Sequence, residues 1–441
     1  MRWVLTLYLR LCERRTNHPV TSLAPRPTLF NMIQRRLFSI LLALVCVSAQ
    51  ADDSQWDRFR GPNGSGRTEV KIPNEWTEET FRWSIDLPGV GHGSPIVWND
   101  QVFLLSADEE SGERFAIAVD AAKGKINWKR AFPDKKNKHH KYNSLASSTP
   151  AADKERVYFS WGTTERLIVS AMSHEGEPVW TADLGPVKGG HGFGASPVVH
   201  KGLVYLNNDQ DGDSSLIALH ARTGEIAWQV PRNSLRLTYS SPVIYKPGDE
   251  EEVIFTNWQH GITSLNPSNG SQNWEKDVFG KPSSERAIGS PIIVEDMVLG
   301  TCGFVTKLKH AVAIRHDPKT GKAEEVWRVE RSVPHIPTPI YANGLVFLLN
   351  DQGMVSCVKP KDGEMLWTER TSGETFGSPV FAHDKLISVN KRGMVFMMAA
   401  TDTFQKVGEY NLRETCHTTP AFSKDTMFIR TYERLHAIKG E

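Results

Sequence analysis

From residue 81 to the end of the chain, short apolar runs alternate with polar turns. The clearest example is a set of four strand-like runs at residues 96–98, 101–105, 115–119 and 125–128. Runs of this length, bounded by Gly, Asn and Asp, predict β-strands. Four such strands in sequence predict an antiparallel meander, which is the unit of a propeller blade.

Two sequence phrases mark eight copies of this meander. A Ser or Thr followed by Pro precedes the first run of each copy, at Pro95, Pro150, Pro197, Pro242, Pro291, Pro339, Pro379 and Pro420. A turn containing Gly leads to an aromatic residue in the last run, at Trp128, Trp180, Trp228, Trp274, Trp327, Trp367 and Tyr410. Self-similarity at about 40–50 residues with strand-like content is typical of propeller blades.

We therefore predict an all-β fold, an eight-bladed β-propeller built from four-stranded antiparallel blades. The eighth copy ends before its outer strand, whereas residues 81–85, which include Trp83, form a spare strand before the first copy. This N-terminal strand should complete the last blade and close the ring, because closure removes exposed sheet edges. The Trp residues are expected to pack on neighbouring blades rather than to bind a ligand.

The residues before the repeat predict export. Residues 32–36 are basic, residues 37–48 are uncharged and mostly apolar, and residues 49–51 (AQA) have the small-x-small form of a signal-peptidase site. We assign 1–31 to a mis-assigned or disordered extension, 32–51 to a signal peptide, 52–80 to a lead-in segment and 81–441 to the propeller. The apolar stretch is shorter than the roughly 20 residues of a spanning helix. The prediction is a periplasmic or extracellular protein without a transmembrane segment.

Charge and cysteine content exclude other classes. Residues 1–51 carry seven Arg and one Glu, which leaves 45 basic and 50 acidic residues in the mature chain. Without a basic excess, no nucleic-acid partner is expected. Cys302, Cys357 and Cys416 share no CxxC spacing, so buried thiols are the main interpretation and one disulfide bridge is the alternative. We expect a monomer.

Several segments resemble a known family. Residues 218–228 (ALHARTGEIAW) resemble the repeat of pyrroloquinoline-quinone-like (PQQ-like) eight-bladed propellers. Residues 56–66, 91–95 and 207–212 are similar to segments of the secreted PQQ-like repeat proteins of planctomycete-type bacteria. The resemblance covers about residues 55–438 and implies the propeller fold. The family includes quinoprotein dehydrogenases and the non-enzymatic outer-membrane assembly subunit BamB, so the fold alone does not decide the function.

The resemblance also sets an expectation about cofactors. Quinoprotein dehydrogenases of this family carry an adjacent cysteine pair over PQQ, a calcium site and a catalytic Asp. This chain has no Cys-Cys pair and no CxxCH motif for a c-type haem. We therefore expect no cofactor and no PQQ.

The loops that lead into the first strands should share one face of the ring, near its axis. Six of them carry a polar side chain that suits ligand binding: His92, His191, Tyr239, Arg286, His335 and His417. Imidazoles also bind metals and act as bases. Three interpretations stay open: a polar rim bonded to the backbone, a pocket for a small ligand or protein partner, and a metal site.

Two further segments have alternative interpretations. Asn207, Asp209 and Asp211 have the spacing of the first half of a calcium loop, but the twelfth position is Ala218 instead of Glu. A solvated hairpin tip is the main interpretation and calcium the alternative. Residues 135–141 form a basic, His-containing loop, which we expect to be solvated.

These observations favour an exported, non-catalytic propeller that acts as a scaffold for protein interaction or ligand binding. The alternative is an enzyme that uses the axial funnel, either a quinoprotein-type dehydrogenase or an unrecognised hydrolase or lyase. No GxSxG, HExxH or Walker-type motif supports hydrolase or nucleotide chemistry.

Overall fold

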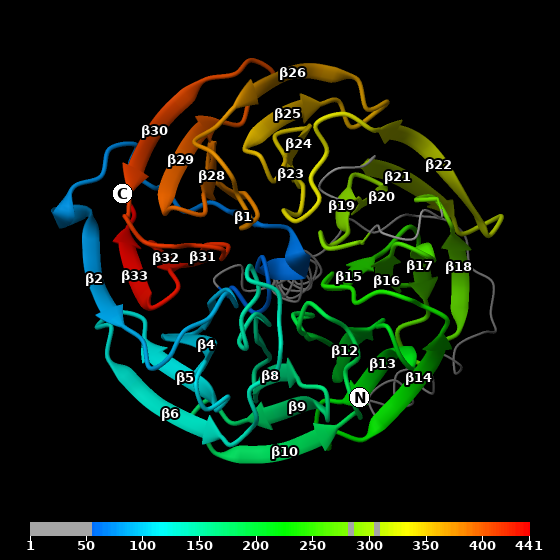
Figure 1. Ribbon diagram of the computed structural model, residues 1–441. Helices are drawn as coiled ribbons and strands as arrows, with labels where there is room; N and C mark the ends of the chain where they lie inside the picture. The colour runs from blue at the N-terminus through cyan, green and yellow to red at the C-terminus, as the bar shows by residue number, and fades with distance from the viewer. Residues whose placement is uncertain (1–54, 281–285, 304–308) are drawn as a thin grey trace, which may run out of the picture. The chain divides into compact units, whose positions relative to one another are not determined.

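The computed structural model describes residues 55–280, 286–303 and 309–441. Eight antiparallel sheets are arranged as the blades of a ring (Figure 1). The fold prediction is confirmed, including the four strands of each blade. The predicted extension and signal peptide, residues 1–51, lie outside the described residues.

Within each blade, the strands follow one another outward from the axis. Blades 1 to 3 consist of β3 (Ile96–Trp98), β4 (Gln101–Ala107), β5 (Arg114–Asp120), β6 (Ile126–Phe132), β7 (Ala151–Ala152), β8 (Val157–Gly162), β9 (Leu167–Met172), β10 (Pro178–Asp183), β11 (Val198–His200), β12 (Leu203–Asn208), β13 (Ser214–His220) and β14 (Ile226–Arg232). Blades 4 to 6 consist of β15 (Val243–Tyr245), β16 (Glu252–Asn257), β17 (Gly261–Leu265), β18 (Gln272–Lys276), β19 (Ile292–Val294), β20 (Met297–Cys302), β21 (His310–Asp317), β22 (Lys322–Val329), β23 (Ile340–Ala342), β24 (Leu345–Leu349), β25 (Met354–Val358) and β26 (Met365–Arg370).

The last two blades contain the closure of the ring. Blade 7 consists of β27 (Val380–Ala382), β28 (Lys385–Val389), β29 (Met394–Ala399) and β30 (Lys406–Asn411), and blade 8 of β31 (Ala421–Ser423), β32 (Thr426–Arg430), β33 (Arg434–Lys439) and β2 (Phe81–Asp86). In blade 8, Trp83 is paired with Ala437, so the N-terminal strand supplies the missing outer strand as predicted. Figure 1 shows blue β2 beside red β33.

The repeated Ser/Thr before Pro has a structural reason. At seven blade junctions, the hydroxyl of this residue accepts a hydrogen bond from the backbone N–H of its counterpart in the preceding blade. The accepting residues are Ser94, Thr149, Ser196, Ser290, Thr338, Ser378 and Thr419, at N–O distances of 2.9–3.0 Å. A hydroxyl satisfies a backbone donor that no sheet hydrogen bond reaches, so this hydrogen-bond ring links the blades around the axis.

The repeated Trp residues link the blades further from the axis. Six indole N–H groups donate to a backbone carbonyl of the following blade, from Trp83, Trp128, Trp180, Trp228, Trp327 and Trp367. Trp274 differs, because it donates to Glu252 of its own blade at 2.8 Å. The main core lies between adjacent sheets, where apolar side chains such as Phe103 and Phe159 are fully buried.

The lead-in segment crosses the axis, and Figure 1 shows it in blue at the centre of the ring. It contains the 3₁₀ helices η1 (Pro62–Gly64) and η2 (Glu78–Thr80) and the short strand β1 (Arg67–Thr68), which pairs with β27. The buried Arg60 donates to the carbonyl oxygens of Pro339 at 2.9 Å and Pro379 at 2.7 Å. Arg58 donates to the carbonyl of Pro242. Two guanidinium groups thus satisfy carbonyls of the repeated prolines.

None of the segments that the structure describes forms a helix long and apolar enough to cross a membrane.

Candidate functional site

The six polar residues of the strand-leading loops all line one axial cavity of about 480 Å³. His92, His191, Tyr239, Arg286, His335 and His417 come from blades 1, 3, 4, 5, 6 and 8. They meet because each blade begins at the axis, so equivalent loops converge there although they are far apart in sequence. Their order around the axis follows chain order, because the blades are successive repeats, whereas their convergence on one cavity is a property of the ring.

Four imidazoles of the cavity form two stacked ring pairs. His92 and His417 are stacked with their ring centroids 4.1 Å apart, and His140 and His191 are stacked at 4.9 Å. Burial lowers the pKa of His191, His335 and His417 to about 4, and lowers that of His92 well below its ordinary value. These imidazoles are therefore neutral at pH 7. A neutral imidazole has one nitrogen that donates a hydrogen bond and one that accepts.

One wall of the cavity is aromatic. Phe376 lies edge-on to His417 at 4.9 Å, and Tyr142 contacts Phe376 at 5.0 Å. The ammonium group of Lys391 lies 4.1 Å from the ring centroid of Tyr142 and 4.8 Å from that of Phe376. This wall provides an apolar surface to which a ring-shaped ligand could pack.

The acidic residues of the lining are already paired with lysines. Asp351 accepts from the Lys309 ammonium at 2.6 Å and from the backbone N–H groups of His335 and Ile336. Glu374 accepts from Lys391 at 2.7 Å. By contrast, Arg286 forms no ion pair with any residue of the described chain, and burial lowers its pKa.

Several buried polar atoms in the lining have no protein partner among the described residues. They are Nδ1 of His92, Nδ1 of His417, the hydroxyl of Tyr239 and Nε of Arg286. Buried polar groups are almost always hydrogen-bonded, and an unmet one costs about 1–3 kcal/mol. A cluster of such groups around one cavity indicates a place where water or a ligand supplies the hydrogen bonds.

The lower end of the cavity is narrow. A space of about 120 Å³ continues along the axis, lined by the Ser and Thr residues of the hydrogen-bond ring and by Phe59 of the lead-in segment. Phe59 and its neighbours Arg58 and Arg60 lie across this end of the axis. The cavity is therefore open toward the face that carries the strand-leading loops.

Sequence reasoning missed several lining residues, among them His140, Tyr142 and Phe376. His140 lies near the end of the 135–141 loop that was expected to be solvated, and it stacks on His191. Tyr142 directly follows this loop and forms part of the aromatic wall. The expectation holds for exposed Lys136 and Lys138, whereas the end of the loop turns toward the axis. The only available signal was the His-x-Tyr pattern within an otherwise basic segment.

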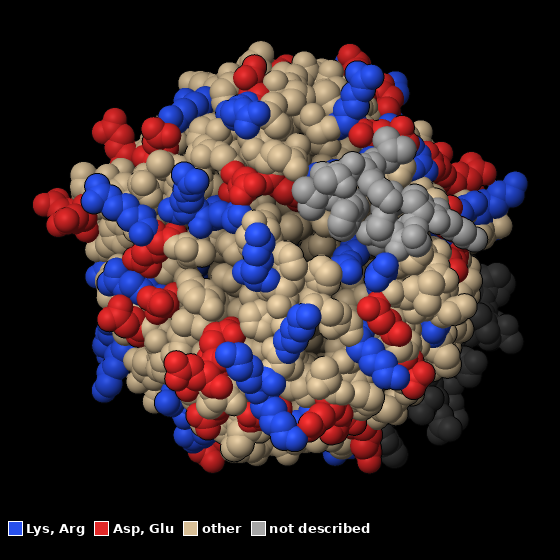
Figure 2. All heavy atoms as spheres, in the orientation of Figure 1, with Lys and Arg blue, Asp and Glu red and all other residues tan. Residues whose placement is uncertain are grey.

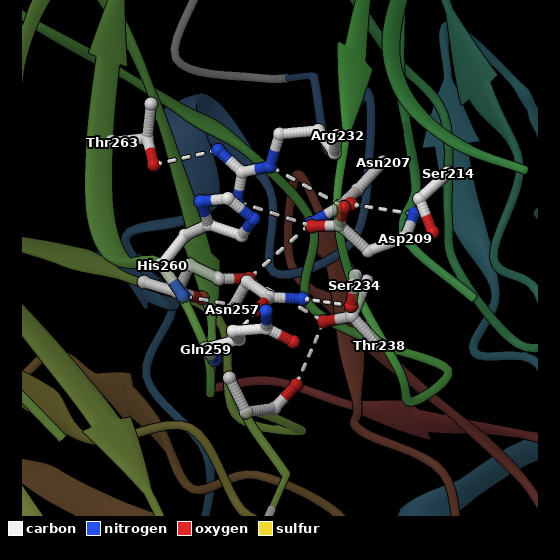
Figure 3. Close-up of polar contacts among 12 residues, drawn as sticks. Asn207, Asp209, Ser214, Arg232, Ser234, Thr238, Asn257, Gln259, His260 and Thr263 are labelled. Carbon is white, nitrogen blue, oxygen red and sulfur yellow. Dashed lines mark hydrogen bonds and ion pairs between the residues drawn. The ribbon is translucent and has the colours of Figure 1, made fainter. Parts of the chain in front are cut away.

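The candidate calcium segment lies beside the cavity in a dense polar network (Figure 3). Asn207 donates from its side chain to the carbonyl of Thr256, and fully buried Asp209 faces Arg232 at 3.3 Å. Burial raises the pKa of Asp209, while Arg232 acts in the opposite direction. Burial also raises the pKa of partly exposed Asp211.

These contacts give the segment a role in joining blades. Arg232 also donates to Thr263 of blade 4 (Figure 3) and to Glu275 of the same blade, so the Asp209 carboxylate is linked through Arg232 to the next sheet. Within the described ranges, no three His, Cys, Asp or Glu side chains converge as a metal-binding group. Calcium at Asn207, Asp209 and Asp211 stays a prediction that metal analysis can test.

The charged side chains on the face shown in Figure 2 do not gather into one area. Over the face shown in Figure 2, acidic and basic side chains are interspersed around the periphery. A mixed surface of this kind gives no single-sign field for a highly charged polymer. The axial cavity is therefore the most distinctive feature of the molecule.

The ring of eight blades and its axial cavity define the class of PQQ-like propellers. The chain belongs to this family: the family model described as outer membrane protein assembly factor BamB matches residues 113–305 and 309–440. A sequence comparison with curated proteins finds no match.

Solved structures share the fold at low sequence identity. BamB from Moraxella catarrhalis has a TM-score of 0.59 and 15% identity, with 81% of this chain and 96% of that chain covered. Quinohemoprotein alcohol dehydrogenase from Comamonas testosteroni has a TM-score of 0.63 and 13% identity, with 89% and 81% covered. The computationally designed Ika8 protein has a TM-score of 0.57 and 11% identity, with 80% and 98% covered. One fold thus serves an assembly factor, an enzyme and a designed ring.

Proposed function

We propose that this protein is an exported, non-catalytic propeller that binds a small ligand in its axial cavity. The observation that carries the proposal is the convergence of six polar side chains from six blades on one cavity. Its volume of about 480 Å³ lies within the range of roughly 300–1,000 Å³ typical of small-molecule sites. A cavity that narrows at its lower end suits a compact ligand better than a protein segment.

The chemistry of the lining favours binding over catalysis. A general base needs a group poised to take a proton near pH 7. Burial lowers the pKa of the cavity imidazoles, to about 4 for His191, His335 and His417, so they are neutral and weak bases. The carboxylates of Asp351 and Glu374 are held by lysines. No described side chain of the lining is therefore placed as a strong base beside a nucleophile.

The test of this function uses a variant that fills the cavity. Ile336 lines the cavity, and Ile336→Trp would occupy part of it with an apolar ring. In a thermal-shift screen of small organic acids, sugars and aromatic compounds, we expect at least one class to raise the Tm of the wild type and not that of the variant. If every stabilising compound acts equally on both proteins, or none stabilises the wild type, the axial cavity is not a ligand site.

The second candidate function is a quinoprotein-type dehydrogenase, which the fold of the Comamonas testosteroni enzyme brings into consideration. The residues present do not fit that cofactor: no cysteine is among the lining residues, and the acids of the lining are paired with lysines. Titration with PQQ and calcium should therefore give no tight binding and no dye-linked alcohol or sugar oxidation. Micromolar binding with turnover would establish the enzyme instead.

Export is part of the proposal. The sequence order of residues 32–51 supports cleavage after Ala51, which gives a mature protein that starts at Asp52. N-terminal sequencing of the protein from the periplasm or medium of its native host should find Asp52. Recovery of intact residues 1–51 from the cytoplasm would contradict it.

A further inference from the structure

The polar atoms of the axial cavity point to one class of ligand. We infer that the ligand is a small sugar acid: a compact, polyhydroxylated ring that carries one carboxylate. This inference deepens the proposed function and rests on it. It is carried by Arg286, which forms no ion pair with a described residue, by buried polar atoms around the cavity that have no partner among the described residues, and by the aromatic wall.

The carboxylate is assigned to Arg286. Among the cationic side chains near the cavity, Lys309 and Lys391 are paired with Asp351 and Glu374. Arg286 lines the cavity without an ion pair to any described residue, and its Nε is a buried donor without a partner. A guanidinium group binds a carboxylate through two parallel hydrogen bonds. These bonds are charge-assisted, so they are stronger than hydrogen bonds between neutral groups.

The hydroxyl groups are assigned to polar atoms elsewhere around the cavity. Nδ1 of His92, Nδ1 of His417 and the hydroxyl of Tyr239 are buried without a partner in the described ranges, and they come from blades 1, 8 and 4. A flat aromatic acid would satisfy Arg286 but leave these three atoms unmet, at about 1–3 kcal/mol each. A ring with several hydroxyls can meet them together, because each hydroxyl both donates and accepts.

The neutral state of the imidazoles supports hydroxyls over additional anions. Burial keeps the pKa of His417 at about 4 and that of His92 well below 6.5. At pH 7 neither ring carries a positive charge that would attract a second carboxylate or a phosphate. The cavity therefore suits a ligand with one anionic group, which binds Arg286, and with neutral polar groups elsewhere. A sugar acid has this composition.

The aromatic wall accounts for the shape of the ligand. Phe376, Tyr142 and the imidazole of His417 form a continuous surface on one side of the cavity. The C–H face of a sugar ring is apolar and removes this surface from water when it packs there. The narrow end at Phe59, a space of about 120 Å³, favours a monosaccharide or the terminal unit of a chain.

The test is calorimetry of the mature protein at pH 7 with three probes: glucuronate, glucose and benzoate. We expect glucuronate to bind at least tenfold more tightly than either glucose, which lacks the carboxylate, or benzoate, which lacks the hydroxyls. Arg286→Met should remove the preference for glucuronate over glucose, whereas Arg370→Met, at an exposed site on β26, should keep it. Ile336→Trp should abolish binding of all three.

The outcomes separate this inference from the proposed function. If benzoate binds as tightly as glucuronate, or glucose equals glucuronate, the ligand is not a sugar acid, although the cavity still binds ligands. If no probe binds while another compound of the thermal-shift screen requires an open cavity, only the sugar-acid inference fails. If no compound distinguishes the wild type from Ile336→Trp, both fail.

Discussion

At the scale of single residues, the hydrogen-bond partner of a buried hydroxyl decides what that hydroxyl contributes. Two tyrosines of this protein differ in this respect. The hydroxyl of Tyr158 donates to Asp153 at 2.7 Å, whereas the buried hydroxyl of Tyr239 lies at the axial cavity without a partner in the described part of the chain. Burial raises the pKa of both phenols, so both are neutral donors and acceptors.

This contrast gives a prediction for Tyr239→Phe. Loss of a hydroxyl without a protein partner should leave the free energy of unfolding unchanged or slightly higher, and it should weaken ligand binding at least fivefold. The matched variant Tyr158→Phe should lose about 1–2 kcal/mol of stability, because it breaks a hydrogen bond to a carboxylate, and it should bind normally. Urea unfolding and calorimetry measure both effects. Equal destabilisation by the two variants would contradict the role assigned to Tyr239.

The cavity imidazoles predict a pH dependence of stability. In the unfolded chain, His takes up a proton near pH 6.5, whereas burial lowers the pKa of His191, His335 and His417 in the folded state to about 4. Between these values the unfolded state binds more protons, so stability is fully present above pH 6.5 and falls as the pH decreases toward 4.

The variant His335→Gln tests this sign. His335 faces Asp351, Lys309 and Arg286, of which only the carboxylate of Asp351 favours protonation. The loss of stability between pH 6.5 and 4.5 should be smaller in His335→Gln than in the wild type, and unchanged in the exposed control His220→Gln. Denaturant unfolding at the two pH values provides the comparison. A steeper loss in His335→Gln would show that protonated His335 is stabilised in the folded state.

At the scale of elements, the repeated phrases act at the junctions between blades. The hydroxyl of Thr149 accepts the backbone N–H of Ser94 at 3.0 Å, and Thr149 is buried. Thr149→Val keeps the shape but leaves that N–H unsatisfied, which should cost about 1–3 kcal/mol. Thr149→Ser keeps the hydroxyl and should cost clearly less. Equal unfolding midpoints for the two variants would mean that the hydrogen-bond ring contributes nothing to stability.

The Gly of one repeat also packs against the Trp of the preceding repeat at a blade junction. Gly176 has φ +85°, and an added Cβ would lie 2.6 Å from the indole of Trp128 in the preceding blade. Gly344 has φ +73° with no atom within 4 Å of an added Cβ. Gly344→Ala should cost about 1–2 kcal/mol for the left-handed backbone alone, and Gly176→Ala should cost about 1–3 kcal/mol more because it overpacks the junction. A similar loss of unfolding free energy in Gly176→Ala and Gly344→Ala would show that the indole moves aside without cost.

At the scale of the whole molecule, closure depends on two segments of the N-terminal region. Strand β2 covers the edge of β33, and Arg60 reaches the carbonyls of blades 6 and 7 at the axis. A protein that starts at residue 91 would lose both and expose a strand edge, so it should aggregate. A protein that starts at residue 55 retains both and should stay monodisperse. Light scattering and thermal unfolding distinguish the two, and a soluble, equally stable truncation at residue 91 would contradict closure.

The fold could be predicted from the sequence because it is encoded locally and repeatedly. Each blade carries the same turn residues and apolar runs, and the structural reason for each phrase is a contact to the next copy, as in Ser94 with Thr149 or Trp128 with His174. The spare strand with Trp83 was also recognisable, because the last copy ended one strand early.

The composition of the cavity could be predicted only in part. His92, His191 and Arg286 were recognisable because each lies in a loop that leads into the first strand of a repeat. Tyr142 and Phe376 were not, because no repeated position marks the residues that turn toward the axis.

What the sequence determined by itself was therefore the blade, the number of blades and the strand that closes them, since these depend on contacts between neighbouring repeats. The tertiary structure decided the site. Stacking of His92 on His417 and the narrow end of the cavity at Phe59 bring together residues from opposite ends of the chain, and Arg286 lines the same cavity without an ion pair to a described residue. Such contacts exist only after the ring has closed, because closure brings the first and last blades together around one axis and buries their polar atoms away from water.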